Sequence, residues 1–174
     1  VLHMKKIISL TLALAVVVSS ALTFSVFAFS DLDGHWGKAY IDTLVNDGTV
    51  NGYEDGTFRP EGTVTRAEFV KMIGKGNEKS NVVYTDVPES HWGYDYIMYS
   101  GLDVSGTQFL PDKAITRGEV LNLIWKRCGS KKGVCAPSVI TNQSDNKDAA
   151  AWGYTYGIMT GDDGLDLRLD DTLT

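Results

Sequence analysis

Apolar residues are distributed along the chain in two ways, as one long run near the start and as short periodic groups after it. The run extends from Ile7 to Ala28 and follows the basic segment Met4-Lys5-Lys6. This order, with small residues at the cleavage-site positions of Val26-Phe27-Ala28, is typical of a secretory signal peptide. The pattern predicts a signal peptide over residues 1–28, although the run is also long enough for an uncleaved membrane anchor.

Two later segments place apolar residues four positions apart. One contains Trp36, Tyr40, Ile41 and Leu44, and the other contains Trp92, Tyr96 and Ile97. Because residues four apart lie on one face of an α-helix, each segment predicts a short amphipathic helix. Tryptophans on such a face are more often core residues than a platform for a ligand, and both interpretations are open at this point.

A second helix is predicted in each half of the chain by a repeated tetrad. The tetrads are Thr65-Arg66-Ala67-Glu68 and Thr116-Arg117-Gly118-Glu119. The threonine is suited to N-cap a helix, and the glutamate three residues on can bind the backbone N–H of the cap, which gives a capping box. Apolar residues flank both tetrads at hydrophobic-staple positions, namely Val64 with Phe69 and Ile115 with Val120. We therefore expect a helix to begin at each tetrad.

Helix stability does not explain the arginine of each tetrad. Arg66 and Arg117 fall in the first helical turn, where the helix dipole disfavours a cation by about 0.3–1 kcal/mol. One interpretation is an ion pair with the neighbouring glutamate or with an aspartate elsewhere. The other is a site for a carboxylate or phosphate, formed by the guanidinium and the free N–H groups of the helix start. The repetition of arginine at equivalent positions favours the anion site.

The same order of elements returns after about 51–60 residues, which indicates tandem repeats. The first unit covers residues 29–75 and the second residues 84–127. Each unit joins its two helices by a Gly-containing turn, Gly52–Pro60 in the first and the shorter Gly106–Pro111 in the second.

A third unit is predicted over residues 148–174. It aligns Trp152 with Trp92 and residues 167–174 with residues 58–65, and it stops at Thr174, the expected N-cap of a closing helix. The third repeat is therefore expected to be incomplete, either because the chain is a fragment of a longer product or because another chain completes it. Residues 76–82 and 128–147 are rich in Gly, Ser, Asn and Lys and are predicted linkers.

The net charge and the two cysteines limit the partners and the metal sites that the chain could have. The net charge is −6, and it becomes −8 without the leader, which holds two lysines and no acids. An acidic surface argues against nucleic acid as a partner, and no second apolar segment is long enough to cross a membrane after signal cleavage. Cys128 and Cys135 are the only cysteines. They either form a short disulfide loop or remain free thiols, and without nearby histidines they cannot complete a zinc site.

Together, these motifs resemble those of the S-layer homology (SLH) domain family. The matching features are the aspartate with a following His-Trp pair (Asp31 with Trp36, Asp86 with Trp92), the turn Gly52–Pro60 and the tetrads, and they cover nearly all of residues 29–174. The resemblance implies a mainly α fold of tandem helix-loop-helix repeats packed around a three-helix bundle, with the third repeat incomplete. Gly118 departs from the alanine that is usual in the tetrad.

The resemblance also implies a function. SLH repeats are non-covalent anchors at the bacterial cell wall or S-layer surface, and they bind secondary cell wall polysaccharide, often with pyruvate ketals, in grooves between units. This implies polysaccharide-binding roles for Arg66 and Arg117, with Asp31, Asp86, Trp36 and Trp92 beside them, and no cofactor. A guanidinium can hold a ketal carboxylate through paired charge-assisted hydrogen bonds. Other surface-layer subunits are the second class of expected partner.

Several of these residues have simpler interpretations. Asp31 and Asp86 could instead cap the first helix of each unit. His35 and His91 are expected to cap or pack rather than to bind a metal. The oxygen-rich segment Asn46–Gly56 lacks the spacing of an EF-hand loop, so its acids are expected to be turn residues.

Two further classes of function stay open. No nucleophile elbow, phosphate loop or zinc signature is present, so we do not expect an enzyme, although the chain could be the anchor portion of a truncated surface enzyme. The third class is a self-associating surface-layer module, in which Arg66 and Arg117 meet carboxylates of neighbouring subunits.

Overall fold

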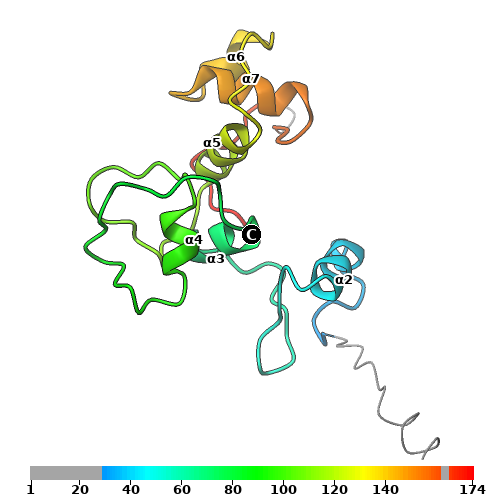
Figure 1. Ribbon diagram of the computed structural model, residues 1–174. Helices are drawn as coiled ribbons and strands as arrows, with labels where there is room; N and C mark the ends of the chain where they lie inside the picture. The colour runs from blue at the N-terminus through cyan, green and yellow to red at the C-terminus, as the bar shows by residue number, and fades with distance from the viewer. Residues whose placement is uncertain (1–28, 162–164) are drawn as a thin grey trace, which may run out of the picture.

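A computed structural model describes residues 29–161 and 165–174, and the predicted signal peptide lies outside these residues (Figure 1). The described chain is mainly helical, without a β-strand. Its helices are α2 (Lys38–Asn46), α3 (Arg66–Met72), α4 (Tyr94–Met98), α5 (Arg117–Arg127), α6 (Ser138–Thr141) and α7 (Lys147–Thr155). None of them is long and apolar enough to cross a membrane.

The two tetrad helices begin where the sequence predicts. Thr65 caps α3 and Thr116 caps α5, and both helices have the complete capping box with Glu68 or Glu119. The residues predicted for the hydrophobic staples lie in one core: Phe69, Ile115 and Val120 are buried, and Val64 packs against them. Local hydrogen bonding and local burial therefore fix the start of each helix.

The residues just before the N-caps form a closed ring of backbone hydrogen bonds. Val64 N–H donates to Leu173 at 3.0 Å, Leu173 N–H donates to Ile115 at 2.9 Å, and Ile115 N–H donates to Val64 at 2.9 Å. These residues occupy the same place in the three predicted units. The ring therefore relates the units by an approximate threefold arrangement, with Thr174 in the position of Thr65 and Thr116.

The turns that precede the ring of backbone hydrogen bonds share an unusual backbone conformation. Arg59, Leu110 and Arg168 all have positive φ, between 52° and 59°, although none is glycine. Such a conformation is uncommon for non-glycine residues, so its recurrence at equivalent positions supports the alignment of residues 167–174 with residues 58–65.

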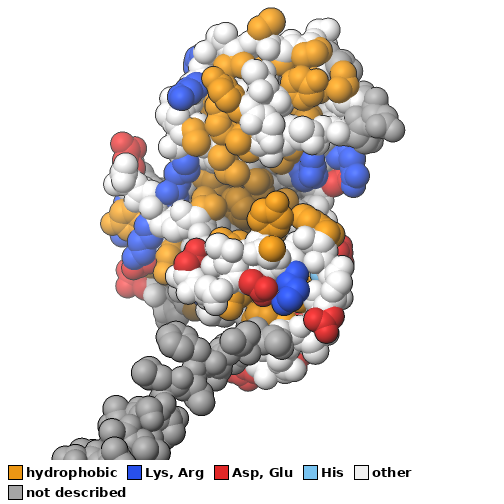
Figure 2. All heavy atoms as spheres, turned by 90° about the vertical axis from the view of Figure 1, so that its right-hand side faces the viewer, with side chains coloured by type: hydrophobic (Ala, Val, Ile, Leu, Met, Phe, Trp, Pro, Cys, Tyr) orange, Lys and Arg blue, Asp and Glu red, His pale blue; other side chains and the backbone are white. Residues whose placement is uncertain are grey.

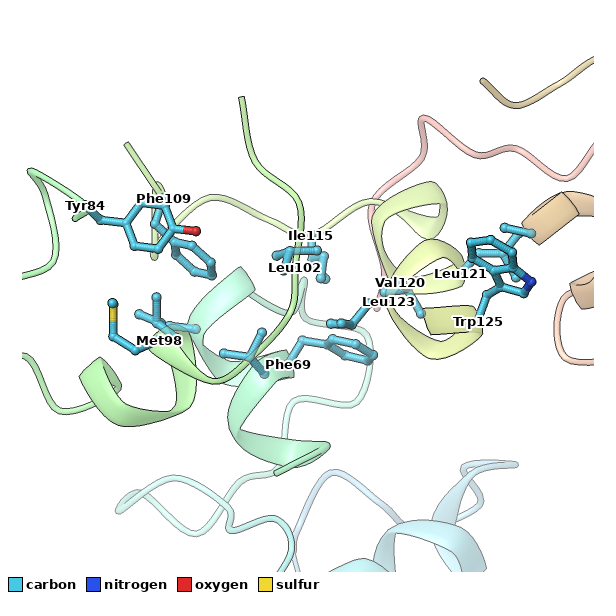
Figure 3. Packing of buried hydrophobic residues seen from close by; sticks show 14 of the residues in the cluster. Phe69, Tyr84, Met98, Leu102, Phe109, Ile115, Val120, Leu121, Leu123 and Trp125 are labelled. Atoms are coloured by element: carbon cyan, nitrogen blue, oxygen red, sulfur yellow. The ribbon is translucent and has the colours of Figure 1, made fainter. Parts of the chain in front are cut away.

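Each tetrad helix packs on the first helix of the following unit. α3 contacts α4, and α5 contacts α7, which also contacts α6. Side chains from α3, α4 and α5 point into a common core that includes Phe69, Met98 and Leu123 (Figure 3). Trp125 and Leu121 extend this core toward α7. By contrast, α2 contacts no other helix in the described part of the chain and has no buried residue.

The alignment of Trp152 with Trp36 and Trp92 is wrong. Trp36 and Trp92 each precede their helix by two residues, whereas Trp152 lies within α7, near its end. The glycines with positive φ that follow α2 and α7, Gly48 and Gly157, fix the register between these two helices. In that register Trp152 corresponds to Thr43. The similar sequence around the tryptophans therefore hides a shift of about two helical turns relative to Trp36 and of about one turn relative to Trp92.

The predicted linkers are fixed at several points. In the first, Gly76 N–H donates to Tyr99 at 2.8 Å and Ser80 N–H donates to Met98 at 2.6 Å. The second contains α6, whose Ile140 is fully buried in a small cluster with Ala150 and Leu167. Composition alone did not predict this burial.

Candidate functional site

Arg66 is the first residue of α3 and is 6% exposed. Its Nη1 donates to the carbonyl of Phe109 at 2.6 Å, while Nε and Nη2 donate to the two carboxylate oxygens of Glu119. This arginine therefore forms an ion pair, but with Glu119 of the next tetrad and not with its neighbouring glutamate or with an aspartate. A ligand would reach its guanidinium only by displacing these partners.

Glu119 connects the first two units. It completes its own capping box by accepting from the Thr116 N–H, and it accepts from Arg66 as well. Burial raises the pKa of Glu119, but the hydrogen bonds from Arg66 and Thr116 outweigh burial, and the net pKa lies below its ordinary value. The carboxylate is thus held in its charged form at the contact between α3 and α5.

Arg117, the equivalent residue of α5, has a different environment. It is half-buried, and its Nε donates to the Leu167 carbonyl at 2.9 Å and its Nη2 to the Thr160 carbonyl at 3.3 Å. No acidic side chain among the described residues pairs with it. Carbonyl oxygens orient the guanidinium but leave its charge uncompensated, which suits an anionic ligand.

The expectation of free N–H groups at the tetrad helix starts is wrong. In α3, the N–H groups of Arg66 and Ala67 donate to Lys113 and Pro111 at 2.9 and 3.0 Å. In α5, the N–H groups of Arg117 and Gly118 donate to carbonyls of residues 171 and 169 in the same way, and the third amide of each helix binds its threonine cap. Hydrogen bonds to neighbouring segments thus occupy the backbone N–H groups at the starts of α3 and α5. An anion could therefore be bound here only by side chains.

Asp31 and Asp86 hold the turns of their own units. Asp31 accepts from the N–H groups of Phe58 and Arg59 at 2.9 and 2.6 Å, and Asp86 accepts from those of Phe109 and Leu110 at 2.9 and 2.7 Å. The interpretation of these residues as helix caps is wrong, because α2 and α4 begin at Gly37 and Gly93 without a side-chain cap.

The turn amides also set the charge of these aspartates. The hydrogen bond from the Phe58 N–H holds the pKa of Asp31 below its ordinary value. Burial raises the pKa of Asp86, but the N–H groups of Phe109 and Leu110 outweigh it and the net pKa is lowered. Both side chains are therefore stabilised as carboxylates by the conformation that they support.

In the first two units the tryptophans are exposed, so the interpretation of these residues as core residues is wrong there. Trp36 is 81% exposed and Trp92 is 56% exposed, whereas Trp152 is buried at 5%. His91 stacks on Trp92, and His35 packs at a tilt against Trp36. Each histidine accepts a hydrogen bond through Nδ1 from the N–H of the N-cap glycine of the following helix, at 3.1 and 3.0 Å, and so fixes the backbone just before the helix.

Lysines and aromatic rings form a surface between the first two units that the sequence analysis did not identify. We call this surface the lysine–aromatic face. It consists of Lys71, Lys75 and Lys79 with Trp92, Tyr94, Tyr96 and Tyr99. The Lys71 ammonium lies 5.8 Å from the Trp92 ring centroid, and the Lys75 ammonium lies 5.6 Å from that of Tyr96. The spacing of the lysines, four residues apart, was the available signal.

A hollow of about 330 Å³ adjoins this face, and Ile73, Gly76, Asn77, Ile124 and Arg127 line it. Among the described residues, Arg127 donates to carbonyls, including those of Ser100 at 3.2 Å and Gly74 at 2.8 Å. The surface between the two units thus combines lysines, an arginine bound to neutral partners and an exposed indole. Lys75 is the lysine of the face that has an acidic partner, Asp95, at 2.6 Å.

Other candidate chemistry is weaker in the described part of the chain. Asp47 and Asp55 accept from the N–H groups two residues on, at 2.9 and 3.0 Å, which confirms their turn role. No group of three or more histidine, cysteine or acidic side chains is placed to hold a metal within residues 29–161 and 165–174. Cys128 and Cys135 are free and exposed.

Comparison with known proteins agrees with the repeat motifs. The family model described as the S-layer homology domain matches residues 28–70. The cellulosome-anchoring protein of Acetivibrio thermocellus is 35% identical over 94 residues, which are 48% of this chain and 21% of that protein. The surface-layer 125 kDa protein of Lysinibacillus sphaericus is 31% identical over 104 residues, 55% of this chain and 9% of that protein.

A third relative has the name of an enzyme. The exoglucanase XynX of Acetivibrio thermocellus is 28% identical over 133 residues, 71% of this chain and 12% of that protein. The aligned segments span about a fifth or less of the length of these three relatives. The family match covers the first unit, including Asp31, Trp36 and the first tetrad. Residues 28–70 therefore match the S-layer homology domain, and about half of the chain is similar to an anchoring protein and to a surface-layer protein.

Proposed function

We propose that this protein is a cell-surface anchor that binds an acidic polysaccharide of the cell wall, such as pyruvylated secondary cell wall polysaccharide. The family and the relatives indicate a location at the cell surface or in the cell wall. We also propose that the chain itself is not an enzyme. The binding of a particular polysaccharide is our inference from the surface chemistry of the first two units.

The observation that carries this proposal is the lysine–aromatic face. The chain is acidic, with a net charge of −6, yet three exposed lysines gather here around four aromatic rings. An exposed indole such as Trp92 can lie against the apolar C–H face of a sugar ring, while Lys71 beside it pairs with a carboxylate substituent. A local basic surface is what an acidic protein needs for binding an acidic polymer.

Among the residues proposed from the sequence, Trp92, Trp36 and Arg117 are best placed for direct contact with a ligand. Trp92 and Trp36 are exposed, and Arg117 has no acidic partner in the described structure. Arg66, Asp31 and Asp86 already bind groups of the protein. We propose that these three residues support binding indirectly, by fixing the start of α3 and the turns of the first two units.

The test is sedimentation with purified wall polysaccharide, before and after removal of its pyruvate ketals. Trp92→Ala and Lys71→Ala should each weaken binding by about five- to tenfold, which corresponds to about 1–1.4 kcal/mol for one stacking or charged contact. Arg117→Lys should also weaken binding, because the planar fork is lost although the charge is kept.

Lys132→Ala is the matched control, since Lys132 is exposed and lies outside the lysine–aromatic face. It removes the same charge and should leave binding unchanged. Equal losses for Lys71→Ala and Lys132→Ala would show that only net charge matters. Unchanged binding in Trp92→Ala and Lys71→Ala would contradict the proposed site.

A second candidate function is the anchor segment of a surface enzyme, which the similarity to the exoglucanase XynX favours. In that case the polysaccharide-binding role of this chain is the same, and the catalytic activity belongs to residues outside it. Sequencing the gene beyond the codon of Thr174 distinguishes the two cases, because a glucanase domain would appear in the same reading frame.

A further inference from the structure

Asn51 and Gly52 form the one Asn-Gly pair of the sequence, at the start of the turn in the first unit. The side-chain amide of an asparagine can be attacked by the backbone nitrogen of the next residue. Glycine hinders this attack least, because it has no Cβ and the widest backbone freedom. Asn51 is exposed, and its peptide link to Gly52 lies outside the helices. The pair therefore combines a reactive sequence with access to water.

The peptide link between these two residues is not held by hydrogen bonds. Among the described residues, neither the side chain of Asn51 nor the N–H of Gly52 has a hydrogen-bond partner. The residues on either side are held, since Val50 N–H donates to Leu44 at 3.2 Å and Tyr53 N–H donates across the turn at 2.8 Å. The attacking nitrogen and the amide that it attacks are thus both free in the folded protein.

The fold requires glycine at position 52. A Cβ on Gly52 would overlap the ring of Phe29, which is 6% exposed and lies 5.5 Å from the ring of Phe58 between centroids. The N–H of Phe58 donates to Asp31 at 2.9 Å, which fixes the turn. Asn51 therefore immediately precedes the contact between the turn and a buried aromatic pair.

The third unit has the glycine but not the asparagine. Extended backward, the alignment of residues 167–174 with residues 58–65 places Thr160 and Gly161 opposite Asn51 and Gly52. A Cβ on Gly161 would lie 2.6 Å from the carbonyl oxygen of Asp166, so this glycine is also required. The close contact at the glycine recurs without an amide before it, so packing alone does not explain Asn51.

We propose that Asn51 is a site of spontaneous deamidation in the folded protein. The Gly52 nitrogen forms a bond to Cγ of Asn51, its proton and the side-chain amino group leave as ammonia, and a succinimide ring results. Water then opens the ring at either carbonyl, which gives aspartate, or isoaspartate with its backbone running through the side chain. This inference does not depend on the proposed polysaccharide.

Both products change the turn of the first unit. A carboxylate at position 51 joins the exposed acids Asp47, Glu54 and Asp55, and like charges repel one another. Exposed acidic side chains are visible in the lower half of Figure 2, which faces the side on which α2 lies in Figure 1. Isoaspartate also adds a carbon to the backbone just before Gly52 and shifts its contact with Phe29. We expect both changes to loosen the turn.

The experiment ages the purified protein in mildly alkaline buffer and follows each asparagine by peptide mass spectrometry. Asn77 is the internal control, because it is exposed and outside the helices but is followed by Glu78. We expect Asn51 to convert about tenfold faster than Asn77, or more, because its neighbour has no side chain. Asn51→Gln should abolish conversion at this position, since the longer side chain would have to close a larger ring.

Amide hydrogen exchange measures the effect on the turn. The N–H groups of Phe58 and Arg59 are held by Asp31, and we expect them to exchange about fivefold faster, or more, after ageing. Protein with Asn51→Gln, aged in the same way, is the matched control and should exchange as fresh protein does.

The outcomes decide both steps of the proposal. Faster conversion of Asn51 than of Asn77, with faster exchange at Phe58, supports it. Conversion of Asn51 no faster than that of Asn77 overturns it. Rapid conversion in urea but not in the folded protein would also overturn it, because the fold would then protect the link. Full conversion with unchanged exchange at Phe58 would overturn the effect on the turn.

Discussion

At the scale of single residues, the environments of Arg66 and Arg117 give them different roles. Arg66 is almost fully buried with both carboxylate oxygens of Glu119 as acceptors, whereas Arg117 binds two carbonyls. Arg66→Ala should therefore lower the free energy of unfolding by about 3 kcal/mol, because it leaves a partly buried carboxylate with only Lys113, at 4.0 Å, as a basic partner among the described residues. Arg117→Ala should cost about 1 kcal/mol, as expected for lost hydrogen bonds to neutral groups.

Urea unfolding of the two variants, followed by tryptophan fluorescence, measures this difference. Arg66→Ala combined with Glu119→Gln should regain part of the loss, since the partly buried negative charge is then removed. Equal destabilisation by the two arginine substitutions would contradict the assignment of Arg66 to the contact between units. It would also restore Arg66 as a candidate for direct ligand binding.

Asp86 gives a prediction about pH. Its folded-state pKa lies below 3.8, the ordinary value, because the amides of Phe109 and Leu110 hold the carboxylate. A lowered pKa stabilises the fold fully above the unfolded-state value, and this contribution is lost as the pH falls through the folded-state value. The free energy of unfolding should thus decrease as the pH falls below about 4.

Asp31 and Asp55 contribute to the same pH window. The pKa of Asp31 is also lowered, and hydrogen bonds from Thr57 and Arg59 lower the pKa of Asp55 to about 2. Unfolding of Asp86→Asn measured from pH 2 to pH 6 should show a shallower acid slope than the original protein. An unchanged slope would show that Asp86 does not hold its turn through its charge.

At the scale of elements, the contact between α5 and α7 depends on a glycine inside a helix. A Cβ at Gly153 would lie 2.3 Å from Cδ1 of Leu121, which is 1% exposed and surrounded by core residues. Glycine to alanine in a helix normally stabilises by about 1 kcal/mol. Here we expect Gly153→Ala to destabilise the protein by about 1–2 kcal/mol through overpacking.

Thermal unfolding measures this effect, and Leu121→Val tests its cause. If the Cβ and the Leu121 methyl group compete for the same space, the double variant should lose less stability than the sum of the two single changes. If the stability losses of the two single variants are additive, the destabilisation by Gly153→Ala arises from a contact of α7 other than that with Leu121.

Elements determined by short-range interactions were predictable from the sequence. The starts of α3 and α5 follow from capping boxes whose partners are three residues apart, and both were found at Thr65 and Thr116. The positions of α2 and α4 followed from the four-residue spacing of apolar residues. Such patterns specify a helix before any tertiary contact is known.

Features determined by distant partners were not predictable. The partner of Arg66 lies 53 residues away, and the amide that Asp31 binds at Phe58 lies 27 residues away. In the described part of the chain no helix packs against α2, next to which Trp36 is exposed, whereas α5 packs against α7 and Trp152 is buried. Periodicity gives the apolar face of a helix, but not whether another element covers it.

At the scale of the whole molecule, the charges of the protein both repel and attract an acidic ligand, at different distances. The chain has a net charge of −6, so it repels an acidic polymer at long range. The lysine–aromatic face attracts the polymer at short range, with Lys71, Lys75 and Lys79 within about 6 Å of aromatic rings. The balance between these terms depends on the ionic strength.

Binding to the acidic polysaccharide should therefore be tighter at about 0.1 M than at about 0.01 M salt, since the Debye length falls from about 30 to about 10 Å. Over this range salt screens the long-range repulsion more than the contacts at the face. Higher salt should then weaken binding as those contacts are screened. Calorimetric titrations at several salt concentrations measure this dependence, and Lys132→Ala should show the same maximum. A steady decrease in affinity from the lowest salt upward would mean that attraction by the lysine–aromatic face exceeds the repulsion even at long range.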